Sequence, residues 1–202
     1  MIIVNIQQRS EAWYAIKAGR VTGTRFKELA AGLDTDTFKN LITDLAGELI
    51  TGEIEESYSN AIMERGIELE PEARGEYENV SGTSVTEVGF IMPDEDNEFN
   101  EWVGISPDGL TEDGMTEFKC PIRKTHLNYI IKGTLPSEYR HQVQGQLFVT
   151  GLPYCDFMSY YPKMKPFIIR VYPDLELFKF YEERLRLVIK EVKAKIELYN
   201  AA

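Results

Sequence analysis

The chain has few cysteines and lacks any long apolar segment. Only Cys120 and Cys155 occur among its 202 residues, and two cysteines make neither a disulfide framework nor a zinc or iron–sulfur cage. We therefore expect reduced thiols in a cytoplasmic protein. No window has the length and apolarity that span a membrane, and the first residues lack a signal-peptide pattern. The expectation is a protein without membrane contact that folds as one domain over residues 1–202.

Basic residues are also scarce, since 22 Lys and Arg stand against 33 Asp and Glu for a net charge of −11. Their distribution is uneven. Residues 48–117 hold 20 acidic residues and two basic ones, whereas residues 119–170 hold eight basic residues, two acidic ones and both histidines. A local basic face can neutralise phosphates whatever the total charge. Nucleic acid therefore stays a candidate partner, and the acidic excess is expected on an outer face or among metal ligands.

One short segment combines a tight turn with several charged groups. It reads GISPDGLTEDGMTEFKCP, from Gly104 to Pro121. The dipeptide Asp113–Gly114 suits the positive φ values that hairpin turns require. The segment therefore predicts two neighbouring strands, Val103–Leu110 and Met115–Cys120.

Two carboxylates and an ammonium group gather on this predicted hairpin. Side chains alternate faces along a strand, so Glu117 and Lys119 share one face and Phe118 takes the other. One interpretation is an ordinary surface ion pair. The other is a magnesium site, in which Asp108 and Glu117 supply the oxygen ligands that hard cations prefer. Lys119 would then assist a water molecule or neutralise charge as a phosphate is attacked.

The periodicity of the remaining chain predicts a mixed α/β fold. Helices are expected over 10–18, 22–31, 37–50, 59–80, 125–131, 137–149 and 175–199, and further strands over 83–92, 101–105, 154–160 and 167–172. Pro71 is expected to interrupt or kink the fourth helix. Helices first, strands in the middle, then helix, strand pair and helix are typical of a mixed α/β domain.

Two predicted helices carry further candidate groups. Glu70 lies among other glutamates, which favours a solvated acidic face, yet such a helix can also bring one carboxylate to the metal pair. Gln142 and Gln146 are four residues apart and share a helical face. Their amides either lie exposed to solvent or hold a water or phosphate oxygen at the site.

The segment WYAIKAGRVTGTRF combines cations and hydroxyls with the start of a helix. Lys17, Arg20, Thr22 and Thr24 lie in this segment. Helix N-termini with hydroxyls and nearby cations bind phosphate well. Helix capping alone would also explain the threonines, so both interpretations remain open.

Taken in order, these motifs resemble the lambda exonuclease and YqaJ-type viral recombinase nucleases of the PD-(D/E)xK superfamily. The resemblance covers nearly the whole chain, and the ordered set is more specific than any single piece. The matching motifs are W-x3-K-x-G-x2-T-x-T at Trp13–Thr24, G-x3-E-P-x-A-R at Gly66–Arg74, S-P-D-G-L at Ser106–Leu110, E-F-K-C-P at Glu117–Pro121 and Q-V-Q at Gln142–Gln144.

The resemblance implies a restriction-endonuclease-like core, with a mixed central sheet flanked by helices. It also implies a Mg²⁺-dependent 5′-to-3′ exonuclease that digests one strand of linear double-stranded DNA to mononucleotides. Such an enzyme leaves a 3′ single strand for phage-type recombination by strand annealing. A bacterial host cell and a phage or prophage origin follow from the same resemblance.

The resemblance also assigns roles to individual residues. Two Mg²⁺ ions per site are implied, for which Mn²⁺ can substitute. The implied groups are Asp108 and Glu117 as metal ligands, Glu70 as the helix carboxylate that reaches the metal directly or through water, the Phe118 carbonyl as a backbone ligand, Lys119 as the catalytic lysine and Gln142 as a polar partner.

A pocket for the terminal 5′-phosphate is implied at Lys17, Thr24 and Ser106. The sequence departs here, because the family often has Arg at the position of Lys17 and Ser at that of Thr24. A point charge thus replaces a bidentate fork, and Arg20 is a candidate to compensate. Met63 falls where the family can place an apolar wedge between the strands, although a core methionine is the simpler interpretation.

The expected partners are linear DNA with a 5′-phosphate, a single-strand annealing protein and two further copies of the chain in a ring-shaped homotrimer. Two rival functions remain. A structure-selective or restriction-type endonuclease would use the same fold, and a catalytically inactive DNA-binding module would not need Asp108, Glu117 and Lys119.

Overall fold

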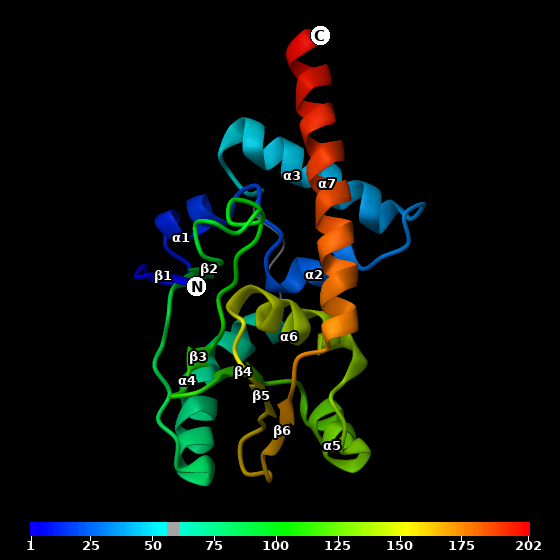
Figure 1. Ribbon diagram of the computed structural model, residues 1–202. Helices are drawn as coiled ribbons and strands as arrows, with labels where there is room; N and C mark the ends of the chain where they lie inside the picture. The colour runs from blue at the N-terminus through cyan, green and yellow to red at the C-terminus, as the bar shows by residue number, and fades with distance from the viewer. Residues whose placement is uncertain (56–60) are drawn as a thin grey trace.

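The computed structural model describes the backbone of residues 1–55 and 61–202, and the side chains of all of these except residues 61–63. Its centre is a four-stranded sheet with the order β3-β4-β5-β6 (Figure 1). The strands are β3 (Gly109–Leu110), β4 (Met115–Lys119), β5 (Cys155–Ser159) and β6 (Phe167–Val171). The β4–β5 pair is parallel, whereas β3–β4 and β5–β6 are antiparallel. This mixed sheet confirms the predicted α/β fold class.

Two helices cover opposite faces of the sheet. The helix α6 (Ser137–Thr150) brings Val143 and Leu147 into the main core with Phe157 of β5. The helix α4 (Ala61–Ser81) packs Tyr77 against Phe118 in a second, smaller cluster. Because strand side chains alternate, Phe118 faces α4 while its neighbours in β4 face α6.

The remaining helices surround this centre. They are α1 (Glu11–Lys17), the 3-10 turn η1 (Gly23–Arg25), α2 (Phe26–Leu29), α3 (Asp36–Thr51), α5 (Arg123–Lys132) and α7 (Leu175–Ala201). The side chains of Ser10, Thr35 and Asp174 cap α1, α3 and α7 by accepting a backbone N–H. Figure 1 shows α7 beside α3, with its C-terminal turns extending beyond the rest of the chain.

Several predicted boundaries were wrong. The strand β1 (Ile2–Val4), which pairs with β2 (Phe90–Met92), was not expected. Most of the region 83–92 is irregular and touches the sheet through one bridge between Thr86 and Leu110. Residues 101–105 form only isolated bridges, and the first hairpin strand shortens to β3. The helix expected over 22–31 divides into η1 and α2.

Pro71 was expected to interrupt or kink the fourth helix, and it does not interrupt α4. The helix continues through Pro71 to Ser81. A proline removes one helical hydrogen bond, but Ala73 and Tyr77 in the next turns are buried against the sheet. This packing offsets the lost hydrogen bond, so α4 is continuous past Pro71. The first two residues expected in this helix, 59–60, lie outside the described residues.

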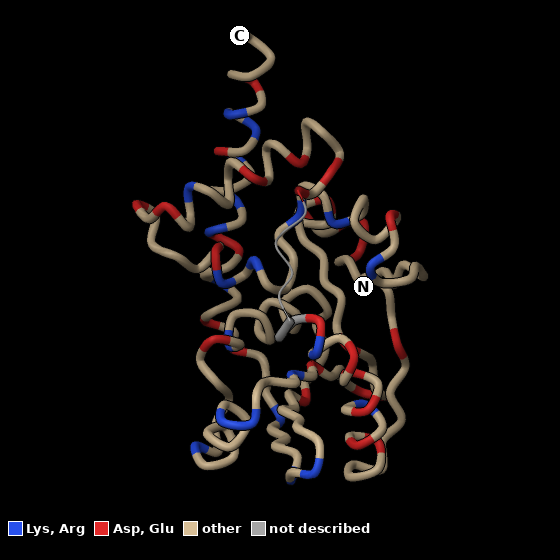
Figure 2. Tube along the Cα trace, turned by 180° about the vertical axis from the view of Figure 1, so that it is seen from behind, with Lys and Arg blue, Asp and Glu red and all other residues tan. Residues whose placement is uncertain are grey.

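Charge is distributed unevenly over these elements. Figure 2 shows acidic residues along α4, and basic residues on α5 and on the turn between β5 and β6. None of the helices in the described part of the chain is long and apolar enough to cross a membrane.

Candidate active site

The strand β4 places a carboxylate and an ammonium group side by side. Glu117 is buried, with 1% of its side chain exposed, and forms an ion pair with Lys119. Phe118 points to the other face of the sheet, where its ring lies 5.7 Å from that of Tyr77. The two-residue spacing of Glu117 and Lys119 therefore brings both side chains to the face that α6 covers.

Asp108 is joined directly to this strand. Its Oδ2 accepts a hydrogen bond of 2.5 Å from the backbone N–H of Phe118. The N–H and C=O of one strand residue point toward the same edge, so the Phe118 carbonyl is directed to the edge where Asp108 lies. The Lys119 carbonyl points the other way and accepts from the N–H of Tyr160 at 2.8 Å. Asp108, Glu117 and the Phe118 carbonyl are thus grouped at one end of β4.

Two glutamines of α6 hold the Glu117 carboxylate. Gln142 donates from Nε2 to Oε1 of Glu117, and Gln146 donates from Nε2 to Oε2 at 2.6 Å. The structure therefore places both amides inside the site. Gln142 was among the expected site residues, whereas Gln146 was recognised only by its spacing. The Gln146 Oε1 atom is buried and has no hydrogen-bond partner among the described residues.

The charges at this end of β4 perturb one another. Burial raises the pKa of Asp108 well above its usual value, and the nearby carboxylates of Glu117 and Glu70 raise it further. Burial alone would lower the pKa of Lys119, but Glu117 and Asp108 outweigh it and raise that pKa above its usual value. Lys119 is therefore a cation in a region where negative charge is in excess.

Glu70 reaches this region from α4 and is held by two arginines. Its Oε2 lies 3.1 Å from Nη2 of Arg9, and its Oε1 lies 3.5 Å from Nη2 of Arg74. About a fifth of the Glu70 side chain is exposed, at 21%. Arg74 also pairs with Glu87. Glu70 is thus close enough to influence Asp108 electrostatically while its ion pairs are with arginines.

The residues at the end of β4 fit a divalent cation. Within residues 1–55 and 61–202, no cluster of three or more His, Cys, Asp or Glu side chains is arranged to hold a metal ion. Mg²⁺ in proteins commonly takes only one or two carboxylates and completes its shell with waters and substrate oxygens. Glu117 offers about four acceptor positions and receives three donors, from Gln142, Gln146 and Lys119. One acceptor position of Glu117 is therefore left. Together with Asp108 and the Phe118 carbonyl, it forms a set of oxygen ligands.

Trp13 links two of the residues expected to bind the 5′-phosphate. Its Nε1 donates to Oγ of Ser106 at 2.7 Å, and Nζ of Lys17 lies 3.5 Å from the centroid of its ring. Ser106 in turn donates to the Gly89 carbonyl at 2.8 Å. Burial lowers the pKa of Lys17 to about 8, and the nearby Arg25 cation contributes to the shift. Lys17 and Ser106 are thus brought together around one indole.

The other two candidates for that pocket lie differently. Thr24 is exposed in η1, and Arg20 donates from Nη1 to the Ile16 carbonyl at 2.7 Å. Burial lowers the pKa of Arg20, and Glu101 partly opposes this shift. Arg20 thus has a local backbone contact, and its compensating role in the phosphate pocket stays a prediction. Met63 lies in the part of α4 whose side chains are outside the described residues.

Sequence reasoning missed an ion pair beneath the same segment. Arg25 of η1 pairs with the buried Glu48 of α3, which also accepts from the Gly19 N–H at 2.9 Å. Gly23 lies against the side chains of Gln142 and Gln146, since a Cβ placed there would be 3.7 Å from the nearest atom of Gln142 and 3.6 Å from that of Gln146. The segment with the phosphate-binding candidates therefore packs directly on the glutamines that hold Glu117.

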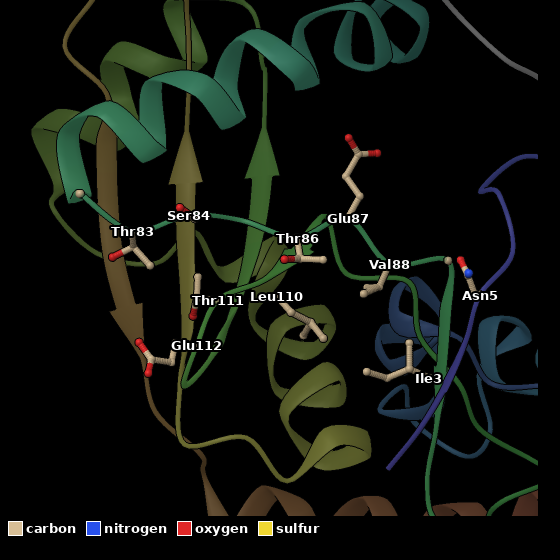
Figure 3. Close-up of a pocket in the computed structure, with 12 residues that line it drawn as sticks. Ile3, Asn5, Thr83, Ser84, Thr86, Glu87, Val88, Leu110, Thr111 and Glu112 are labelled. Carbon is tan, nitrogen blue, oxygen red and sulfur yellow. The ribbon is translucent and has the colours of Figure 1, made fainter.

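A groove of about 770 Å³ lies on a different part of the surface, between β1 and the region 82–89. Figure 3 shows Thr83, Ser84 and Thr86 along one extended segment, with Ile3 and Asn5 at the far end. None of the predicted catalytic residues lines this groove. The candidate active site is thus the group at the end of β4, not the groove.

Comparison with known proteins identifies the family. Residues 12–153 match the YqaJ-like viral recombinase domain. The chain belongs to the YqaJ-like viral recombinase family. This membership confirms the resemblance found in the sequence motifs.

Solved structures share the fold over nearly the full chain. The alkaline exonuclease LHK-Exo from Laribacter hongkongensis is 34% identical, with a TM-score of 0.84 over 95% of this chain and 97% of that one. The same values hold for LHK-Exo in complex with dAMP. A phage-related exonuclease from Haemophilus somnus 129PT is 17% identical, with a TM-score of 0.64 over 89% of this chain and 96% of that one, and supports the fold alone. Comparison with curated proteins gave no match.

Proposed function

We propose that this YqaJ-family chain is a Mg²⁺-dependent 5′-to-3′ exonuclease that digests one strand of linear double-stranded DNA to mononucleotides. The observation that carries the proposal is the group of Asp108, Glu117 and Lys119 at one end of β4, with Gln142 bound to Glu117. Similarity to the alkaline exonuclease LHK-Exo, including a structure with dAMP, supports a nuclease that acts on DNA. The product is a 3′ single strand suited to annealing.

Asp108, Glu117 and the Phe118 carbonyl would hold the cations, and Glu70 would join them directly or through water. When bound, Mg²⁺ supplies Lewis-acid polarisation of the scissile phosphate and makes water a better nucleophile. Two ions per site fit the carboxylates gathered here, since the pKa of Asp108 is raised first by burial and then by the charges of Glu117 and Glu70. Mn²⁺ takes the same oxygen ligands.

The protein groups have separate tasks in the proposed reaction. Lys119, held as an ammonium by its carboxylate neighbours, donates hydrogen bonds to the attacked phosphate and offsets its growing negative charge. A lysine with a raised pKa is a poor general base, so its role is electrostatic. Gln142 and Gln146 fix both oxygens of Glu117 and keep its rotamer constant. The chain thereby positions phosphate and nucleophile before the bond breaks.

We propose that the 5′-to-3′ direction of digestion is set by the Trp13 cluster, which consists of Trp13, Lys17 and Ser106. Lys17 and Ser106 offer a cation and a hydroxyl beside one indole, and Thr24 adds an exposed hydroxyl nearby in the chain. These are the groups that bind a terminal phosphate dianion. Binding the end of the strand would set the scissile bond one nucleotide away, so each cleavage releases a mononucleotide and creates a new 5′-phosphate.

The decisive experiment compares two DNA substrates in the presence of Mg²⁺. We expect 5′-phosphorylated linear duplex to be converted to acid-soluble mononucleotides while covalently closed circular duplex stays intact. Nicking or linearisation of the circle would instead favour the restriction-type endonuclease. Retained DNA binding without any cleavage in Mg²⁺ or Mn²⁺ would favour the inactive binding module.

Assembly forms a separate part of the proposal. A ring-shaped homotrimer around DNA would keep a protein of net charge −11 on its polyanionic substrate without many exposed cations. Light scattering on the purified chain should then give about three times its 23.2 kDa mass. A single-strand annealing protein is the proposed partner, because the 3′ strand left by digestion is its substrate. Pull-down with and without DNA tests this pairing.

A further inference from the structure

Arg9 has a backbone conformation that its residue type does not favour. Its φ is +67°, and only Lys163 among the other described non-glycine residues also has a positive φ. Left-handed φ values suit glycine, and a side chain in this region strains the backbone. Such outliers persist only where the surrounding structure holds them, and they cluster at active sites and ligand-binding segments. The question is therefore what the guanidinium of Arg9 does.

The turn that carries Arg9 is fastened to the candidate active site. Nε2 of Gln8 donates to the carbonyls of Val88 at 2.9 Å and Pro107 at 3.2 Å, and Pro107 directly precedes Asp108. Ser10 caps α1, the helix that ends with Lys17. The position of the turn is thus fixed relative to both the metal carboxylates and the phosphate-binding candidates.

The Arg9 side chain lies at the solvent-facing side of this group. Its Nη2 is 3.1 Å from Oε2 of Glu70, and 45% of the side chain is exposed. Glu70 has a second cation, because Arg74 lies 3.5 Å from its other oxygen. Arg9 can therefore leave Glu70 without stranding that carboxylate. A planar guanidinium with several donors binds phosphate oxygens in pairs.

We propose that Arg9 is a substrate-binding residue that moves from Glu70 to a DNA backbone phosphate. The inference rests on the proposed nuclease function. A divalent cation bound beside Glu70 weakens the attraction of that carboxylate for Arg9, and the incoming phosphate diester offers a replacement anion. Arg9 thus forms an ion pair with Glu70 in the free protein and contacts a DNA phosphate in the complex.

Two variants at Arg9 distinguish direct contact with DNA from an indirect role in supporting Glu70. Arg9→Gln removes the charge and keeps a side chain, and Arg9→Gly also relieves the backbone strain. Affinity for a 5′-phosphorylated duplex is measured by fluorescence anisotropy in saturating Ca²⁺, and Ca²⁺ affinity without DNA is measured by calorimetry. We expect both variants to bind the duplex about tenfold more weakly and Ca²⁺ at least as tightly as the unaltered chain. The slope of log affinity against log salt should fall by about one.

The backbone effect has its own control. Lys163→Gly relieves the other left-handed side chain, at φ +64°, and is compared with Arg9→Gly in thermal unfolding only. Weaker Ca²⁺ binding with unchanged duplex affinity would overturn the proposal, since Arg9 would then only support Glu70. Unchanged affinity for both would overturn it as well. Failure of the unaltered chain to bind duplex would instead reject the proposed function, and this inference with it.

Discussion

Gln146 donates a 2.6 Å hydrogen bond from its amide to Oε2 of Glu117, from within a helix that covers the sheet. The acceptor is 1% exposed and the donor is buried to the same degree. A hydrogen bond to a buried carboxylate is among the stronger ones, and its loss leaves charge unsatisfied. The orientation of Glu117 therefore depends on a residue that need not touch DNA.

We expect Gln146→Met to lower the rate of nucleotide release by about tenfold or more, because Glu117 loses one of three donors. The matched control is Gln144→Met in the same helix. Gln144 is also buried, but it bonds the Tyr172 carbonyl and the Asp174 N–H instead of the site. Initial rates and urea midpoints are measured for both variants. Equal rate losses for the two at matched stability would contradict the positioning role of Gln146.

Replacing either of the two charged groups that are proposed to act on the scissile phosphate should strongly reduce digestion. Asp108→Asn keeps an acceptor for the Phe118 N–H but loses the cation ligand, and Lys119→Met loses the ammonium. We expect each to reduce nucleotide release by roughly a thousandfold, about 4 kcal/mol of barrier. Circular dichroism verifies the fold. A folded Lys119→Met with activity within about tenfold of the unaltered chain would reject the assignment.

The same Asp108→Asn substitution should stabilise the metal-free protein. Burial and the carboxylates of Glu117 and Glu70 disfavour the ionised form of Asp108. The neutral amide removes this cost at neutral pH. Urea unfolding in EDTA should show a higher midpoint for the variant, and added Mg²⁺ should stabilise the unaltered chain more than the variant. A lower midpoint in EDTA would contradict the electrostatic account.

Selectivity for a 5′-phosphate should fall as pH rises past 8. The pKa of Lys17 is lowered to about 8, so its charge is present below this value and lost above it. We expect the rate ratio between 5′-phosphate and 5′-hydroxyl duplex to decline from pH 7 to pH 9. Lys17→Arg should keep the ratio constant over this range, and Lys17→Met should lower it at every pH. A pH-independent ratio in the unaltered chain would assign the terminal phosphate to another group.

The lowered pKa of Lys17 also affects folding stability. The contribution of Lys17 to stability rises with pH, whereas selectivity for the 5′-phosphate falls. The unfolded chain binds a proton at Lys17 up to about its ordinary pKa of 10.5, whereas the folded chain releases it near 8. Between these values the unfolded state binds more protons, so the contribution of Lys17 to stability rises with pH. Lys17→Met should therefore be more stable than the unaltered chain at pH 7, by a margin that shrinks by pH 10 in denaturant titrations.

Close packing between α6 and α2 makes Gly145 sensitive to substitution. A Cβ at this position would lie 2.3 Å from the ring of Phe26. We expect Gly145→Ala to destabilise the protein by about 1–3 kcal/mol and to displace the segment with Thr22 and Thr24. Gly47→Ala in α3 meets open space and should instead be stabilising by about 0.5–1 kcal/mol. Urea titrations of both variants test this contrast.

Local signals in the sequence predicted much of the fold. The periodicity of apolar side chains predicted helices over 37–50, 137–149 and 175–199, and the structure places them at Asp36–Thr51, Ser137–Thr150 and Leu175–Ala201. The alternation along β4 likewise placed Glu117 and Lys119 together. The pairing of Ile2 with Met92 could not be predicted, because it joins distant segments that carry no turn signal.

The sequence could predict which site residues lie together only when they belong to the same helix or strand. The spacing of Gln142 and Gln146 gave their common face, but nothing in that spacing indicates Glu117 as their acceptor. Glu70 shows that the contacts of a residue can be unpredictable even when its helix is predicted. Its helix was foreseen, yet its ion pair with Arg9 depends on where an irregular N-terminal turn lies in space. Tertiary placement of irregular segments is what sequence periodicity does not contain.

The hydrogen bond between Asp108 and the Phe118 N–H has a practical consequence. The backbone N–H of Phe118, in the central sheet, donates to the Asp108 carboxylate, which is proposed to bind cations. Any ion that draws electron density from this carboxylate must weaken the bond, and so alter the chemical shift and hydrogen exchange of that single amide. Labelled with ¹⁵N, Phe118 should therefore report occupancy of the site by nuclear magnetic resonance, without DNA and without turnover.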